Sequence, residues 1–434
     1  MVVHALASLL CLAAPQVPAD PVNLVLEAVD PARPMADVER LVQFHTRHTL
    51  SETESDERGI GAARRWLKAE FERISEATGG RLEVREQRFR AEVLGQDVEM
   101  VNVYGFLPGR EVAPLGRTYV VSGHYDSRVR SNRDATSYAP GANDDASGTA
   151  VVLELARVMS TQSYRANLVF LTVPGEEQGL FGAKHFAEEA KAAGWEIDGM
   201  ITNDIVGGVE GGNGVRDEVT IRCFSASEDG LNSPSRELAR ALASSAEKYV
   251  PDARVRLVFR LDRFGRGGDH RPFHEAGYPA LRLTEANEHY ARQHQDVGER
   301  DGVMYGDLPE HVSADYMARV ARVNAAALGE WASAPAPPEW LSMRAAVSYD
   351  TQLGWAPSDG AAGYEIVWRD TTMPKWTDSL RVPHEVRTQQ RRGGGTREIV
   401  QGTVERVTAD THFFGVRAVD AAGHRSRVVL ARRP

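Results

Sequence analysis

Side chains that commonly bind metal ions recur at five places between residues 124 and 296. Each place follows a short apolar run or opens a helical run, and the candidates are His124 with Asp126, Asp144 with Asp145, Glu176 with Glu177, Asp204, and His294 with Asp296. Any one of them alone is more often a surface or helix-capping residue than a ligand. The joint pattern is harder to explain in that way, because carboxylates gathered at one edge of a sheet would repel one another.

A pair of divalent cations would remove that repulsion. Two histidines with three carboxylates form a mixed nitrogen and oxygen ligand set, which suits zinc, with manganese or cobalt as substitutes. A metal lowers the pKa of bound water to about 7, so one of two adjacent glutamates can take a proton while the other holds the metal. Asp126 is placed to accept the free ring N–H of His124. The predicted chemistry is metal-assisted hydrolysis.

Strand-like and helix-like runs alternate around these residues. Apolar runs at residues 118–122, 167–173 and 199–204 predict strands, and residues 147–159 and 180–193 predict helices. This order predicts an α/β domain with a mainly parallel central sheet flanked by helices. Ligand sites in such sheets collect beyond the carboxyl ends of the strands, where the candidate residues fall.

The pattern changes after a Pro-rich stretch at residues 332–338. Residues 364–369 and 413–420 alternate between apolar and polar side chains, which predicts a small all-β sandwich. We therefore expect a catalytic domain at residues 22–331, a linker at residues 332–338 and a sandwich at residues 339–434. The sandwich segment contains no catalytic constellation.

An apolar stretch at residues 5–14, followed by Pro15, is typical of a secretory signal peptide over residues 1–19. The expected location is therefore secreted or periplasmic, although no Lys or Arg precedes the stretch and a disordered apolar tail is the alternative. Cleavage would remove Cys11 and leave Cys223, for which we expect a buried apolar role.

The balance of 51 basic and 61 acidic residues excludes a protein that binds nucleic acid or anionic lipid through overall charge. The N-terminal apolar stretch is too short to cross a bilayer. The expected partner is a peptide or protein substrate, and the sequence leaves the oligomeric state open.

Five stretches together resemble the M28 zinc peptidases, the aminopeptidase family with two co-catalytic zinc ions. They are residues 122–127 (SGHYDS), 141–148 (GANDDASG), 175–180 (GEEQGL), 203–204 (ND), and 268–273 (GDHRPF) with 277–280 (GYPA). The likeness covers roughly residues 35–331. Residues 339–434 resemble a fibronectin type III module more weakly, through Trp355 and residues 363–368 and 414–420.

The M28 resemblance implies a role for each candidate. It makes Asp144 the carboxylate that bridges both metals, with His124 and Asp204 completing one zinc site and Glu177 and His294 the other. Glu176 would be the general base, and Asp126 the partner of His124. The family commonly has a Tyr directly before the last histidine ligand, whereas here Tyr290 follows His289, so His289 remains an alternative to His294. His270 is expected to form structural hydrogen bonds.

The leading hypothesis is the removal of N-terminal amino acids from peptides, with a hydroxide held by two zinc ions attacking and Glu176 transferring the proton. A metallo-carboxypeptidase or deacylase with the same ligands, a one-zinc glutaminyl cyclase, and a non-catalytic binding protein that keeps the fold are the alternatives. Arg263 and Arg266 are candidates for a pocket that accepts acidic substrates, and exposed surface arginines are the ordinary alternative.

Overall fold

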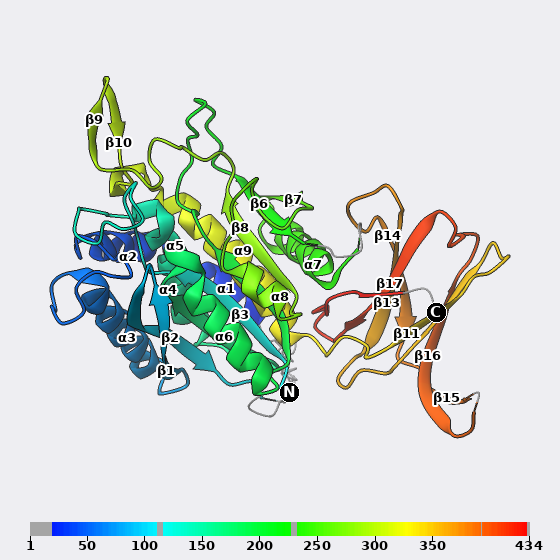
Figure 1. Ribbon diagram of the computed structural model, residues 1–434. Helices are drawn as coiled ribbons and strands as arrows, with labels where there is room; N and C mark the ends of the chain where they lie inside the picture. Colours follow the sequence, from blue (N-terminus) through cyan, green and yellow to red (C-terminus); the bar gives the residue numbers. More distant parts are fainter. Residues whose placement is uncertain (1–19, 111–115, 227–231, 392, 432–434) are drawn as a thin grey trace, which may run out of the picture.

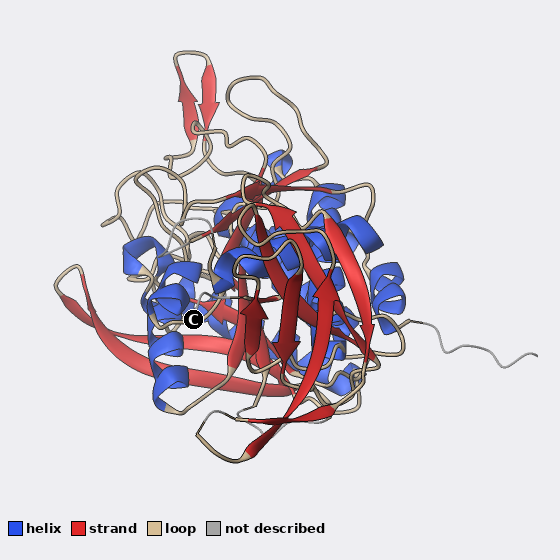
Figure 2. Cartoon of the chain, turned by 90° about the vertical axis from the view of Figure 1, so that its right-hand side faces the viewer, coloured by secondary structure: helices blue, strands red, loops and turns tan. Residues whose placement is uncertain are grey.

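The computed structural model describes residues 20–110, 116–226, 232–391 and 393–431, so the predicted signal peptide and Cys11 lie outside it. Among these residues, eight strands form one sheet with helices on both faces (Figures 1 and 2). In spatial order they are β1 (Glu83–Val93), β2 (Gln96–Leu107), β4 (Asn167–Val173), β3 (Thr118–His124), β5 (Ile197–Asn203), β8 (Ala280–Glu285), β6 (Thr220–Ser225) and β7 (Arg254–Val258).

The strands at the centre of this sheet, β4, β3, β5 and β8, pair in parallel. Successive side chains of β3 point to opposite faces, because Tyr119 and Val121 enter one core and Val120 enters the other. Burial on both faces explains why these strands appear in the sequence as continuous apolar runs. The predicted α/β class with a mainly parallel central sheet is confirmed.

One face of the sheet is covered by α1 (Pro21–Ala28), α2 (Ala32–Val42), α3 (Gly59–Ala77), α4 (Ser147–Met159), α7 (Pro234–Tyr249) and α9 (Ala314–Ser333). The other face is covered by α6 (Phe181–Ala192) and α8 (His270–Glu275). A hairpin of β9 (Gly298–Arg300) and β10 (Val303–Tyr305) projects from the molecule (Figure 1). In the described chain, no helix is both long enough and apolar enough to cross a membrane. Cys223 is a free thiol buried in the first of these cores, as expected for an apolar role.

In the described part of the C-terminal region, two antiparallel four-stranded sheets pack around one core. The first contains β11 (Leu341–Arg344), β12 (Thr351–Trp355), β16 (Thr396–Val404) and β15 (Arg387–Gln390), and the second β14 (Asp378–Pro383), β13 (Gly363–Asp370), β17 (His412–Val419) and β18 (Val429–Leu430). Trp355 of one sheet packs against Tyr364 of the other, with ring centroids 5.3 Å apart. This unit is a small β-sandwich.

The sandwich is attached to the first unit through polar contacts on α7 and α9. The buried Glu330 carboxylate of α9 accepts hydrogen bonds from Arg425 of the sandwich at 2.8 Å and from Lys248 of α7 at 3.2 Å. Trp376 Nε1 of the sandwich donates to the buried Glu237 at 3.0 Å. These contacts fix the sandwich against the helical layer.

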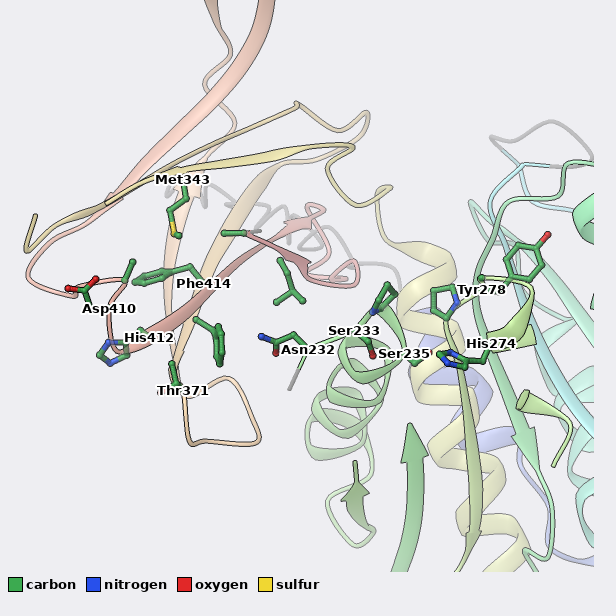
Figure 3. Close-up of a pocket in the computed structure, with 17 residues that line it drawn as sticks. Asn232, Ser233, Ser235, His274, Tyr278, Met343, Thr371, Asp410, His412 and Phe414 are labelled. Carbon is green, nitrogen blue, oxygen red and sulfur yellow. The ribbon is translucent and has the colours of Figure 1, made fainter. Parts of the chain in front are cut away.

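A cavity of about 890 Å³ lies between the two units (Figure 3). Ser233 and Tyr278 line it from the first unit, and Met343 and Phe414 line it from the sandwich. None of the candidate metal ligands borders this space. The chemistry predicted from the sequence therefore belongs elsewhere in the molecule.

Glu330→Gln is expected to lower the free energy of unfolding by about 1–3 kcal/mol, because the charged groups of Arg425 and Lys248 lose their shared counter-charge. Urea denaturation measures the change. Glu247→Gln is the matched control, because its partner Lys375 lies in the same interface but the pair is solvent-exposed, and its cost should stay below about 1 kcal/mol. Equal effects of the two substitutions would contradict a stabilising role for the Glu330 contacts.

Candidate metal centre

Asp144 lies in a short turn (Ala142–Ala146) directly before α4, and close backbone contacts set the position of this turn. A Cβ atom on Gly148 would lie 2.1 Å from the carbonyl oxygen of Asn203, and one on Gly123 would lie 2.6 Å from the backbone of Gly148. Glycine at both positions therefore lets the end of β3, the start of α4 and the end of β5 touch. Those three points carry His124, Asp144 and Asp204.

Asp145 links the end of β3, the start of α4 and the end of β5 through hydrogen bonds to their backbones. One of its carboxylate oxygens accepts the backbone N–H of His124 at 3.0 Å, and the other accepts those of Gly148 at 3.0 Å and Ile205 at 3.3 Å. The side chain is buried. Asp145 thus has a structural role, and its neighbour Asp144 is left to face the cluster.

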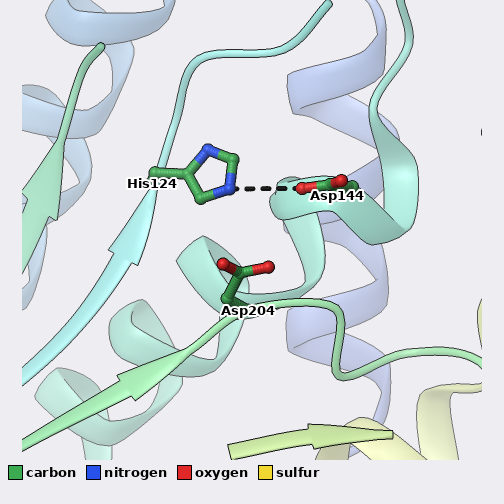
Figure 4. A group of neighbouring side chains, drawn as sticks. All are labelled: His124, Asp144 and Asp204. Atoms are coloured by element: carbon green, nitrogen blue, oxygen red, sulfur yellow. Dashed lines mark ion pairs between the residues drawn. The ribbon is translucent and has the colours of Figure 1, made fainter. Parts of the chain in front are cut away.

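His124, Asp144 and Asp204 form the first group of side chains that could hold a metal (Figure 4). His124 Nε2 lies 3.2 Å from Asp144 Oδ1, and one ligand atom from each of the three residues lies within 4.8 Å of the others. All three side chains are buried. The group comes from three elements that are far apart in the sequence.

Asp144, Glu177 and His294 form a second such group among the described residues. His294 Nε2 lies 2.9 Å from Asp144 Oδ2 and 2.9 Å from Glu177 Oε2. Asp144 therefore belongs to both groups and presents one oxygen to each histidine. This is the arrangement of a carboxylate that can serve two neighbouring cations.

The donor atoms fit a metal better than they fit one another. Within the described chain, His124 Nε2, His294 Nε2 and Glu177 Oε1 are buried and have no hydrogen-bond partner. Buried polar atoms of this kind normally find partners, so three unpartnered atoms on the candidate ligands need an explanation. Imidazole nitrogen together with carboxylate oxygen is a donor set suited to zinc.

The shifted pKa values of Glu176 and His294 indicate that negative charge exceeds positive charge around these two residues. Burial raises the pKa of Glu176 well above its ordinary value, and the nearby charges of Asp204 and Glu177 raise it further. Burial lowers the pKa of His294, but the carboxylates of Glu177 and Asp144 outweigh that effect and raise it to about 10. A divalent cation would balance this surplus.

Asp126 orients both a histidine and the glutamate pair. Its Oδ1 lies 3.4 Å from His124 Nδ1, and its backbone oxygen lies 3.2 Å from the same nitrogen. Its two carboxylate oxygens also accept the backbone N–H groups of Glu176 at 3.3 Å and Glu177 at 3.1 Å. These glutamates open α5 (Glu176–Gly179), so one buried carboxylate positions groups that follow two different strands.

Glu176 faces the same space as the candidate ligands. It lines a cavity of about 170 Å³ together with Asp144, Asp204 and His294. Glu177, the adjacent residue, belongs to the second ligand group, whereas Glu176 belongs to neither. The geometry therefore gives the two glutamates different surroundings.

Asp307 is a site residue that the sequence analysis missed. Its buried carboxylate accepts the backbone N–H of Asn143 at 2.9 Å and that of Asp144 at 2.7 Å. Burial raises its pKa to about 7. A single aspartate between a hairpin and a short helical turn gives no local signal for this contact.

Arg47 was also missed, and it supports the centre from the N-terminal region. Its fully buried guanidinium donates to the carbonyl oxygens of Tyr125 at 2.8 Å, Pro140 at 2.6 Å and Gly141 at 2.9 Å. These acceptors flank both the segment carrying His124 and the turn carrying Asp144. Burial lowers the pKa of Arg47 to about 10.

Arginines also contact one carboxylate in each ligand group. Arg282 Nη2 lies 2.6 Å from Asp204 Oδ1, and Arg128 Nε donates to Glu177 Oε2 at 2.9 Å. Arg128 Nη2 lies 2.6 Å from Nδ1 of His294. Arg128 opens the loop at residues 128–140, so this loop begins at the centre.

The alternative histidines lie outside both ligand groups. His289 is partly exposed beside Gly212, and no candidate group among the described residues includes it. His270 is buried with Nε2 2.7 Å from the carbonyl oxygen of Leu261, and burial lowers its pKa to about 4. Asp296 also belongs to neither group.

Comparisons with known proteins identify the family of the chain. Residues 102–325 match the model of peptidase family M28. A probable zinc metalloprotease of Leptosphaeria maculans is 40% identical over 95% of this chain and 97% of its own length. The LapA aminopeptidase of Legionella pneumophila superposes with a TM-score of 0.56 at 19% identity, over 76% of this chain and 80% of that one. A glutaminyl cyclase from an Acidobacteriales bacterium superposes with a TM-score of 0.51 at 18% identity, over 73% of this chain and 96% of that one. The chain therefore belongs to peptidase family M28 and is a metallopeptidase.

Proposed function

We propose that this enzyme removes N-terminal amino acids from peptides with two zinc ions. One ion would be held by His124, Asp144 and Asp204, and the other by Asp144, Glu177 and His294. The observation that carries the proposal is the sharing of Asp144 between two ligand groups that border one small cavity. The relative named as a probable zinc metalloprotease and the solved aminopeptidase of the same fold support it.

The chain's own residues supply proton transfer and orientation. When bound, zinc would polarise the scissile carbonyl and make a water molecule more acidic. Glu176, which borders the cavity and is outside both ligand groups, would take the proton and return it to the leaving amine. Asp126 would keep His124 in the tautomer that presents Nε2 to the metal.

The lining of the cavity favours a free N-terminus over an internal peptide bond. Glu176 and Asp204 both border it, and its volume of about 170 Å³ is below that of pockets that hold drug-sized ligands. A substrate α-ammonium group near these carboxylates would gain charge-assisted hydrogen bonds.

The proposal extends to the whole chain. Residues 1–19 would act as a secretory signal peptide, residues 22–331 as the catalytic domain, and residues 339–434 as a fibronectin type III-like domain after the linker at residues 332–338. The polar contacts of Glu330 and Glu237 support a packing role for the C-terminal sandwich.

Glu176→Gln is expected to lower kcat by about a hundredfold to ten-thousandfold, because the amide cannot accept the proton. Zinc content, measured by elemental mass spectrometry, should stay at the wild-type level because Glu176 is in neither ligand group. Glu188→Gln, an exposed glutamate on α6, is the control and should leave both quantities unchanged. Full activity in Glu176→Gln would remove Glu176 as the base.

Metal removal tests the reaction class. A chelator should abolish the release of a fluorescent amine from aminoacyl amides, and added zinc should restore it. The same amides with an acetylated α-amine should not be cleaved, because they lack the ammonium group. Equal cleavage of free and acetylated substrates would contradict an aminopeptidase and favour an endopeptidase or deacylase. Cleavage that survives complete metal removal would contradict the metal requirement.

A further inference from the structure

Arginines gather beside the small cavity at the candidate metal centre, and two of them, Arg263 and Arg266, line it. The buried carboxylate of Glu288 contacts Arg222 at 2.7 Å, Arg263 at 3.0 Å and Arg266 at 2.7 Å. Three guanidinium groups thus share one dedicated carboxylate. Most of their charge is not balanced by Glu288.

A second buried carboxylate, Asp262, does not remove this surplus. It contacts Arg263 at 3.0 Å, and it also contacts Arg282 at 3.4 Å, which brings a further positive charge. Arg282 is fully buried, and it also contacts the carboxylate of the candidate ligand Asp204 at 2.6 Å. The four arginines therefore pair with three carboxylates, Glu288, Asp262 and Asp204, which leaves one excess positive charge in this wall of arginines.

Within this wall, Arg266 is fixed in position with one edge left open. Its Nη1 donates to Glu288 Oε2 at 2.7 Å and to Gln293 Oε1 at 2.9 Å, so the guanidinium plane is anchored. No acceptor in the described part of the chain contacts its Nε or Nη2. Its side chain is 30% exposed. The Nε and Nη2 edge is the fork that pairs with both oxygens of a carboxylate.

Arg266 and Arg263 line the cavity that Glu176, Asp204 and His294 also line. A group bound to the open edge of Arg266 would therefore lie beside the reacting centre. The volume of about 170 Å³ suits a single short side chain. The lining carries both carboxylates and guanidinium groups, so it complements a residue that has both an ammonium and a carboxylate.

We propose that Arg266 binds the side-chain carboxylate of the substrate's N-terminal residue, so that the enzyme prefers N-terminal glutamate or aspartate. This inference rests on the proposed removal of N-terminal residues. The α-ammonium group would face Glu176 and Asp204, while the side-chain carboxylate would face Arg266. Arg263, held by Asp262 and Glu288, adds positive charge to the same side.

The test compares glutamyl with glutaminyl fluorogenic amides, and aspartyl with asparaginyl ones, because each pair differs in charge but hardly in size. The wild-type kcat/KM should favour the acidic member by about tenfold or more. Arg266→Gln should reduce that ratio by about tenfold to a hundredfold, because the bidentate charged pair is lost. Arg266→Lys should retain part of the preference for the acidic substrate, because lysine keeps the positive charge but cannot bind both carboxylate oxygens with paired N–H groups.

Arg260→Gln is the matched control, because Arg260 is an exposed arginine of the same loop that contacts only the ring of Phe264 among the interactions described. In Arg260→Gln, the ratio of kcat/KM for the acidic substrate to kcat/KM for the neutral one should stay at the wild-type value. Glu288 keeps Arg222 and Arg263 in Arg266→Gln, so the fold of the loop should survive. An unchanged acidic preference in Arg266→Gln, or a wild-type preference for the neutral member of each pair, would overturn the proposal.

A binding measurement separates this inference from the proposed function. Free glutamate and glutamine are titrated into the zinc-loaded protein by calorimetry, with and without Arg266→Gln. Glutamate should bind about tenfold more tightly than glutamine to the wild type, and this difference should vanish in the variant. If no aminoacyl amide is cleaved, the proposed function fails. Equal binding of the two amino acids would overturn the role of Arg266.

Discussion

The buried negative charge around Asp144 is the constraint on which the rest of the centre depends. Carboxylates from five separate segments converge near the carboxyl ends of parallel strands, where their desolvation is costly. Backbone N–H groups stabilise Asp145, Asp126 and Asp307, and arginines stabilise Asp204 and Glu177. Asp144 lies between two histidines, His124 and His294, and it is the carboxylate that both ligand groups share.

Residues far from the catalytic motifs in the sequence form hydrogen bonds that hold the charged centre in place. Arg47 precedes the family match at residues 102–325, yet it donates to the carbonyl oxygens that flank the segments of His124 and Asp144. Asp307 lies beyond the β9–β10 hairpin and holds the Asp144 turn through its backbone. The segment after α2 and the segment after the β9–β10 hairpin therefore help to position the centre.

The parts that could be predicted from the sequence are those with a local pattern. The strand at residues 167–173 and the helix at residues 147–159 have the bounds expected from their apolar runs. The candidate ligands could be located because each follows an apolar run or opens a helix, and the ends of parallel strands meet. Their assignment to particular metals came from the family resemblance and remains a proposal.

The supporting residues could not be predicted, for a physical reason. Arg47 and Asp307 bond to backbone groups about 80 to 165 residues away, and a backbone acceptor or donor leaves no residue-type signal in the sequence. Arg282 lies inside an apolar strand, where its pairing with Asp204 depends on tertiary contact. The open edge of Arg266 is likewise visible only once Glu288 and Gln293 are in place.

The most direct test of the central claim is the zinc content per chain, measured by elemental mass spectrometry after exhaustive dialysis. The account predicts about two zinc ions in the wild type, about one in His294→Ala, and about two in the control His289→Ala. Asp144→Ala should lose most of both ions, because it removes the shared ligand. Two ions retained in Asp144→Ala, or a single ion in the wild type, would contradict a centre in which Asp144 joins two metals.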